Sequence, residues 1–266
     1  MTTDPAPASV PTPPSERLRS VLGCTQHPGN IGSAARAIKT MGLSRLVLVG
    51  PERASSAEAS ALAAGADDVL AAAQRFETLA EAVADCRLVL GCTARSRRVA
   101  LDELLPREAA ARAVADATVG AEVALVFGRE RTGLTNDELQ LCHAAVHIPA
   151  NPEYSSLNLA AAVQVLAYEL RLALLDRAGG EGMPVVAADP GRGDPPASHA
   201  ELEGFFSQLG ETLDAIDFHK GRAPESAMRK LRRLFLRADL DSREVRLLRG
   251  ILADAERMAM LAGQRR

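Results

Sequence analysis

Three residues near the N-terminus have the types and spacing to hold a ligand: Asn30, Gly32 and Arg36. They lie between the apolar runs at residues 21–23 and 46–49, in the first turns of a predicted amphipathic helix. The dipole disfavours an arginine near a helix N-terminus, and a bound phosphate would compensate because guanidinium groups match phosphate oxygens. The alternative is a solvent-exposed arginine, with Asn30 as an ordinary helix cap.

Three further turns each follow an expected strand: GCTAR at residues 91–95, FGRERTGL at 127–134 and IPANPEYSSLNLA at 148–160. The first two contain glycine, and the third contains serine and alanine as its small residues. In open α/β sheets, ligands bind outside the carboxyl ends of the strands. We therefore expect these turns to converge on one pocket, where small residues let the backbone approach a ligand closely.

Each of these turns also has an ordinary structural explanation. Gly91 and Gly128 could simply end strands, and Ser155 and Ser156 could cap the helix that follows them. Glu130 stands between two arginines and could form a surface ion pair. No single turn decides between a ligand site and a structural role.

The elements that must position these residues alternate between short β-rich runs and alanine-rich helical patterns. This alternation predicts an α/β fold with a mainly parallel sheet. The expected strands are residues 19–23, 46–49, 88–91, 124–127 and 146–148. The expected helices are residues 32–41, 77–84, 104–114 and 159–176, with shorter ones at 57–64 and 135–142.

Composition divides the chain into four parts. Residues 1–17 are rich in proline and predict a disordered tail, and residues 18–177 form the α/β domain. Residues 178–199 have the glycine and proline content of a linker, and residues 200–266 predict a small helical extension.

From His219 onward the chain has 13 Lys and Arg against 6 Asp and Glu, although the net charge of the whole chain is −3. A basic end on an acidic protein predicts a polyanionic partner.

Several classes of protein are disfavoured. The four cysteines, Cys24, Cys86, Cys92 and Cys142, include no C-x-x-C pair, so we expect free thiols and no metal site. The sequence has neither a G-x-G-x-x-G nor a P-loop fingerprint, which argues against a nicotinamide oxidoreductase. With no apolar run long enough to span a bilayer and no secretory signal, we expect a cytoplasmic protein without a membrane partner.

Three motifs together resemble those of the SPOUT-class RNA ribose 2′-O-methyltransferases. They are N-x-G-x-x-A-R at residues 30–36, F-G-R-E-x-x-G-L at 127–134 and N-P-E-Y-S-S-L-N-L-A at 151–160. Their order and separation match, and the similarity runs from about Arg19 to Arg249, including MRKLRRLF at 228–235. Within the class, the chain is similar to the bacterial enzymes that methylate cytidine or uridine 32 in the tRNA anticodon loop.

The resemblance implies a trefoil knot in the C-terminal part of the sheet, a homodimer formed through the knot region, and S-adenosylmethionine as cofactor. Carried over by position, it implies a set of cofactor-binding residues from three loops. They are Cys92, Thr93, Ala94, Gly128, Ile148, Ser155, Ser156, Leu157 and Asn158. At Cys92 we expect contact through the backbone, so its thiol need not react.

The resemblance also implies roles in catalysis and RNA binding. Arg36, Asn30 and Ser156 would serve catalysis, with Arg36 either activating the ribose hydroxyl directly or holding a phosphate and stabilising the developing alkoxide. A neutral arginine is unfavourable because the free side chain has a pKa above about 12, which favours the second role. The residues expected to bind tRNA are Arg36, Glu130, Arg229, Lys230, Arg232 and Arg233.

We expect tRNA binding to depend on phosphate contacts more than on base stacking, because the chain has no tryptophan and few other aromatic residues. Two alternatives stay open at this point. One is a methyltransferase of the same fold that acts on another tRNA position or on ribosomal RNA. The other is a non-catalytic RNA-binding protein.

Overall fold

A computed structural model describes residues 12–25, 27–50, 57–94, 101–179, 194–220 and 223–263. Its centre is a seven-stranded sheet in the order β3-β2-β1-β6-β4-β7-β5, and every neighbouring pair of strands is parallel. The strands are β1 (Leu18–Gly23), β2 (Arg45–Val49), β3 (Gln74–Phe76), β4 (Leu88–Cys92), β5 (Asp102–Leu104), β6 (Val123–Phe127) and β7 (Ala144–Val146). The predicted α/β fold with a parallel sheet is confirmed.

The five expected strands are all present, and the sheet has two more at its edges. β3 and β5 are three residues long and mostly exposed, so they lack the buried apolar run that marks the inner strands. β7 begins earlier than expected and ends at Val146, which leaves Ile148 in the loop beyond the strand.

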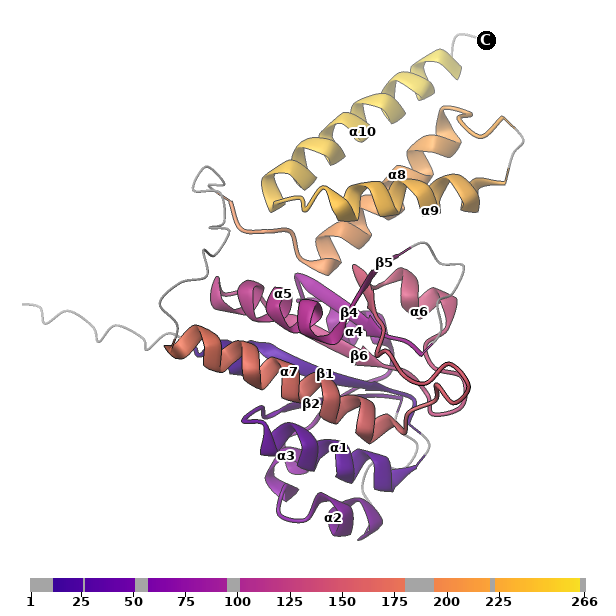
Figure 1. Ribbon diagram of the computed structural model, residues 1–266. Helices are drawn as coiled ribbons and strands as arrows, with labels where there is room; N and C mark the ends of the chain where they lie inside the picture. Colours follow the sequence, from indigo (N-terminus) through magenta and orange to yellow (C-terminus); the bar gives the residue numbers. More distant parts are fainter. Residues whose placement is uncertain are drawn as a thin grey trace, which may run out of the picture.

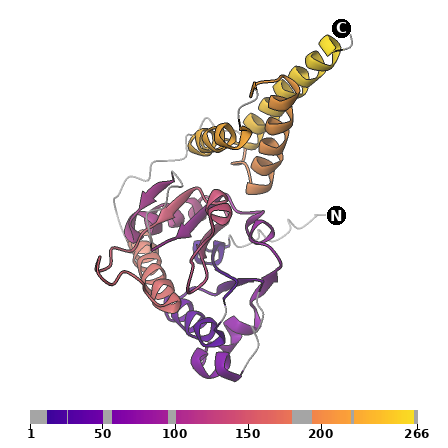
Figure 2. The same cartoon turned by 90° about the vertical axis from the view of Figure 1, so that its right-hand side faces the viewer.

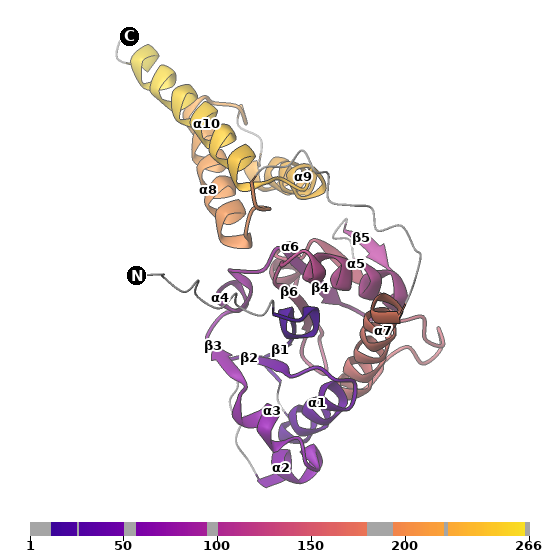
Figure 3. The same ribbon diagram turned by 90° about the vertical axis from the view of Figure 1, so that its left-hand side faces the viewer.

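Helices cover both faces of the sheet (Figures 1 and 3). α1 (Pro28–Thr40) and α5 (Pro106–Thr118) pack alanine-rich sides on one face, and α7 (Leu159–Gly179) packs a side rich in leucine and valine on the same face. α4 (Leu79–Val83) and α6 (Asn136–Gln140) cover the other. α2 (Ala57–Ala63) and the unexpected α3 (Asp67–Ala71) pack against α1. This layered arrangement buries the inner strands on both sides.

Helix α1 begins one turn earlier than the sequence indicated. Pro28 occupies its first position, where a missing N–H is tolerated. Asn30 therefore lies inside the first turn and is not the helix cap, which frees its side chain for other contacts. Gly42, in the left-handed region at φ 76°, follows the C-terminal end of the helix, as a terminating glycine does.

The C-terminal residues form three helices, α8 (His199–Ala215), α9 (Pro224–Arg237) and α10 (Ser242–Gly263). They have their own apolar cluster, centred on Phe205 and Phe206 of α8 with Val245 of α10. Figure 2 shows these helices beside the sheet domain, at the end away from α2. The predicted helical extension is confirmed.

The exact domain boundaries stay predictions, as does the trefoil knot. Residues 1–11 of the expected tail and 180–193 of the expected linker lie outside the described residues. Within the expected tail, η1 (Pro14–Arg17) forms a short 3-10 helix, and Arg17 donates a hydrogen bond to the carbonyl oxygen of Gly120 at 3.0 Å. Among the described helices, none has the length and apolar character needed to cross a bilayer.

Candidate functional site

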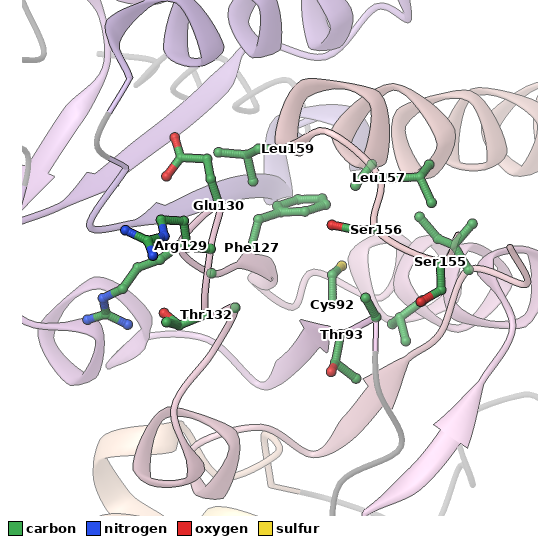
Figure 4. Close-up of a pocket in the computed structure, with 17 residues that line it drawn as sticks. Cys92, Thr93, Phe127, Arg129, Glu130, Thr132, Ser155, Ser156, Leu157 and Leu159 are labelled. Atoms are coloured by element: carbon green, nitrogen blue, oxygen red, sulfur yellow. The ribbon is translucent and has the colours of Figure 1, made fainter. Parts of the chain in front are cut away.

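A cavity of about 340 Å³ lies at the carboxyl ends of β4, β6 and β7. Its walls come from the three turns that follow these strands, so the expected convergence is present. All the predicted cofactor residues except Asn158 line it, together with Phe127, Val146, Leu159 and Ala162. In Figure 4, Arg129, Glu130 and Thr132 lie on one side, Ser155 and Leu157 on the other, and Cys92 and Ser156 point between them.

Sequence reasoning missed the apolar residues of the cavity, although their positions carry a signal. Phe127 and Val146 are the last residues of β6 and β7, and Leu159 is the first of α7. β6 and β7 lie on either side of β4 in the parallel sheet, so the apolar residues at their ends lie at the same edge as the loops that follow. They give the cavity a wall suited to a flat apolar ring.

Gly128 is required by the tight turn that forms one wall of the cavity. Arg129 and Gly133 exchange two backbone hydrogen bonds, at 2.8 and 3.3 Å, and Gly133 has a φ of +66°. A Cβ atom on Gly128 would lie 2.2 Å from the backbone of Gly133 and Leu134. The second motif therefore has its glycines because its backbone folds onto itself.

The thiol of Cys92 faces the cavity but is not activated. Burial, with the neighbouring Cys142, raises its pKa, so the thiol stays protonated near neutral pH. The next residue, Thr93, donates its backbone N–H to the carbonyl oxygen of Val146 at 3.0 Å. The expected contact between the Cys92 backbone and a cofactor stays a prediction.

A chain of side-chain hydrogen bonds joins the three motifs. Asn158 donates its amide N–H to Asn30 Oδ1 at 2.9 Å, and Asn30 donates to Glu130 Oε1 at 3.1 Å. The backbone N–H of His27 also donates to Glu130 Oε1, at 3.3 Å. The sequence indicated all three motif residues but not this contact, which joins segments at least 100 positions apart.

Asn158 also begins helix α7. Its Oδ1 accepts hydrogen bonds from the backbone N–H groups of Ala160 and Ala161, at 2.9 and 3.4 Å. The cap is therefore Asn158, and the alternative in which Ser155 and Ser156 cap this helix is wrong. Both serines line the cavity instead.

Arg36 lies on the same helix as Asn30 but not in the cavity. Its side chain is exposed, and among the residues that the structure describes it has no hydrogen-bond or ion-pair partner. Gly32, the other residue of the first motif, has a packing role, since a Cβ there would lie 2.0 Å from the carbonyl oxygen of Ala59 on α2. The first motif thus holds α1 against the second and third motif loops through Asn30 and against α2 through Gly32, and it leaves Arg36 exposed.

The second loop is anchored from behind by Arg129. Its Nη1 donates to both carboxylate oxygens of Glu138 on α6, at 3.0 and 2.9 Å, and its Nη2 donates to Cys24 Sγ at 3.2 Å. The hydrogen bonds to Glu138 raise the pKa of Arg129, which stays charged. This arginine therefore supports the loop as part of an ion pair.

The predicted RNA-binding residues of the extension all lie on α9, but in different environments. Arg229 and Lys230 are exposed, and Arg233 Nη2 lies 3.4 Å from Asp102 Oδ1 at the surface. Arg232 is largely buried, since only 16% of its side-chain surface is exposed, and it contacts other parts of the chain. Within the described residues, no group of three or more His, Cys, Asp or Glu side chains could hold a metal ion.

A parallel α/β sheet with a cavity built from three motif loops defines a class, and comparison with known proteins identifies it. The family model described as the SpoU rRNA Methylase family matches residues 17–168. The chain belongs to the SpoU methylase family, and its resemblance to SPOUT-class methyltransferases is confirmed. A second family model, described as the C-terminal domain of the tRNA methyltransferase TrmJ, matches residues 200–264.

Relatives over almost the whole chain are named tRNA (cytidine/uridine-2′-O-)-methyltransferase TrmJ. The relative from Salmonella choleraesuis is 51% identical over 247 residues, covering 91% of this chain and 97% of its own. The one from Klebsiella pneumoniae is 52% identical over 241 residues, with the same coverage. The crystal structure of TrmJ from Z. mobilis ZM4 has a TM-score of 0.75 at 36% identity, covering 90% of this chain and 98% of its own.

Proposed function

We propose that this protein transfers a methyl group from S-adenosylmethionine to the ribose 2′-hydroxyl of cytidine or uridine in tRNA, at position 32 of the anticodon loop. The observation that carries this proposal is the chain of hydrogen bonds from Asn158 through Asn30 to Glu130, which assembles all three motifs beside one cavity. The names of the relatives, together with the C-terminal match, favour tRNA over ribosomal RNA.

The cavity fits S-adenosylmethionine in size and in chemistry. Its volume of about 340 Å³ lies within the range of small-molecule sites. Apolar side chains of Ile148, Leu157 and Leu159 suit the adenine ring, and the turn at Gly128 adds a wall without a side chain at that position. When bound, the cofactor would supply an electrophilic methyl group on a positively charged sulfur.

The residues of the chain must then hold the ribose 2′-oxygen in line with the methyl group and the sulfur, and must assist the loss of the proton from this oxygen. In our proposal Arg36 stays charged, binds an RNA phosphate and stabilises negative charge that develops on the 2′-oxygen. Asn30 fixes the helix that presents Arg36, and the hydroxyl of Ser156 contacts the reacting sugar. Proton acceptance then falls to a phosphate oxygen or to water.

The location of Arg36 supports a homodimer. Its side chain is exposed and lies outside the cavity of its own chain, whereas its proposed role requires it beside a reacting ribose. A second copy that pairs through the region of the cavity would bring its own Arg36 to that site. We therefore infer two composite sites per dimer, with tRNA docked on the exposed cations of α9.

Methyl incorporation from labelled S-adenosylmethionine into unmodified tRNA transcripts tests this function. We expect the wild-type protein to methylate the transcript, and we expect Arg36→Ala to reduce the rate by at least about 100-fold. A transcript with a 2′-deoxy sugar at position 32 should accept no methyl group.

Each other outcome would change the proposal. Unchanged incorporation into the deoxy transcript would move the target away from position 32. Tight cofactor binding without methylation of any tRNA would argue for another RNA, such as ribosomal RNA. Full activity of Arg36→Ala would contradict the role of this arginine.

A further inference from the structure

The side chain of Arg232 on α9 contacts both parts of the molecule. Its Nε donates a hydrogen bond to the carbonyl oxygen of Gln140, the last residue of α6, at 2.9 Å. Its Nη2 forms an ion pair with Glu203 of α8, and its guanidinium carbon lies 4.6 Å from the centre of the Phe206 ring. A single side chain therefore joins the C-terminal helices to the sheet domain.

Helix α6 in turn supports the cofactor loop. It is only five residues long and begins directly after this loop, with Thr135 as its cap. Its Glu138 accepts the two hydrogen bonds that Arg129 Nη1 donates, and its buried Leu139 belongs to the same apolar cluster as Leu134 at the end of the loop. A displacement of α6 would therefore move the wall of the cavity that Gly128 and the following residues form.

We propose that Arg232 is a positioning residue that acts through α6 to hold the cofactor loop at residues 128–134 in its binding conformation. This inference rests on the proposed function, because it assumes that the cavity binds S-adenosylmethionine. It gives Arg232 a different role from the RNA contact that the sequence indicated. The C-terminal helices then support the cofactor site in addition to offering a surface for RNA.

The contacts of Arg232 explain why this position needs an arginine. A buried charge must be paired, and here Glu203 supplies the opposite charge. The planar guanidinium can donate to Gln140 while it lies over the Phe206 ring, and a lysine ammonium cannot reproduce this geometry. Arg229, one turn earlier on α9, is exposed and has no partner among the described residues, which suits a phosphate contact.

Calorimetry of S-adenosylmethionine binding to the full-length protein without RNA tests the proposal. We expect Arg232→Gln and Arg232→Lys to raise the dissociation constant roughly 3- to 20-fold, the size typical of coupling through a packed element. Arg257→Gln is the matched control, since it removes an exposed arginine from α10 and should leave the cofactor affinity unchanged. A lysine that restores full affinity would overturn the proposal, because a simple charge would then suffice.

A double-mutant cycle separates action through α6 from general destabilisation. Glu138→Gln weakens the same connection at its other end, so combining it with Arg232→Gln should weaken cofactor binding less than the product of the two single effects. Fully multiplicative effects would overturn the proposal. If Arg232→Gln does not fold, the cycle is completed with Arg232→Lys.

The salt dependence of tRNA binding distinguishes the two roles of an arginine on α9. Loss of a phosphate contact reduces the slope of log affinity against log salt by about one, which we expect for Arg229→Gln but not for Arg232→Gln. A reduced slope with unchanged cofactor affinity in Arg232→Gln would overturn the inference and restore the RNA contact. Absence of cofactor binding by the wild-type protein would instead contradict the proposed function.

Discussion

At the scale of single residues, Asn30 is where the three motifs meet. Its carboxamide accepts from Asn158 and donates to Glu130, so it joins α1 to the second and the third motif loops. Asn30→Ala should lower kcat about tenfold or more, because α1, the helix that presents Arg36, loses its hydrogen bonds to the second and third motif loops. Steady-state kinetics measure this loss, with Thr40→Ser on the same helix as the control. A variant with normal kcat and a raised KM for the cofactor would show that Asn30 acts on binding alone.

His143 gives a second prediction at this scale, on stability. Burial lowers its pKa from 6.5 to about 3, and its Nδ1 accepts a hydrogen bond from the backbone N–H of Val89 at 3.1 Å, which requires the unprotonated nitrogen. Because the unfolded chain takes up this proton first, stability should fall as pH drops below about 6.5 and continue to fall towards about 3. Between pH 7 and 5 the loss from this group is about 2 kcal/mol.

Urea unfolding of wild type and His143→Gln at both pH values measures this effect. The variant should be less stable at pH 7 and should lose less stability than wild type between pH 7 and 5. An identical loss in the two proteins would show that other groups produce the acid sensitivity.

At the scale of elements, the close approach of α1 and α2 depends on Gly32. A methyl group there would lie 2.0 Å from the carbonyl oxygen of Ala59, so Gly32→Ala must separate the two helices. We expect a loss of stability of about 1–3 kcal/mol and lower methyl transfer, because α1 holds both Asn30 and Arg36.

Gly250→Ala on α10 is the matched control for this substitution. Its Cβ would meet no atom within 4 Å, and alanine favours helix over glycine by about 1 kcal/mol. Thermal unfolding should therefore show opposite shifts for the two variants. Equal tolerance of alanine at both positions would show that α1 and α2 can separate without loss.

Burial decides which of the observed helices and strands could be predicted from the sequence. The inner strands and the long helices could be predicted from sequence, because burial on one or both sides imposes apolar patterns on them. β3, β5 and α3 were missed because they are short and largely exposed, so their residue types are weakly constrained. The cap at Asn158 was missed because two serines nearby offered an equally good pattern.

At the scale of the whole molecule, the proposed dimer predicts complementation between two defective chains. Arg36→Ala keeps an intact cavity, and Gly128→Ala keeps Arg36 but distorts the cofactor loop. Each should be nearly inactive alone. When the two chains pair at random, about half of the dimers are mixed, and each mixed dimer has one complete site out of two, so the mixture should have about a quarter of wild-type activity. Co-expression, purification and a methyl-transfer assay measure this.

Light scattering on the same samples provides the control for assembly. A dimeric mixture without activity would show that Arg36 serves the cavity of its own chain. A monomeric protein with full wild-type activity would contradict the proposed dimer.

By itself, the sequence determined the class of fold and the three motif loops, and its resemblance to the SPOUT-class enzymes indicated nine cofactor residues, of which all but Asn158 line the cavity. Hydrophobic patterns and glycine positions are local consequences of burial and backbone geometry, so they can be seen in a single chain. The tertiary structure alone decided which side chains meet: the chain from Asn158 to Glu130, the outward location of Arg36, and the burial of Arg232 against α6. These contacts join residues about 90 or more positions apart, and they depend on how the strands are ordered in the sheet, which local patterns do not encode.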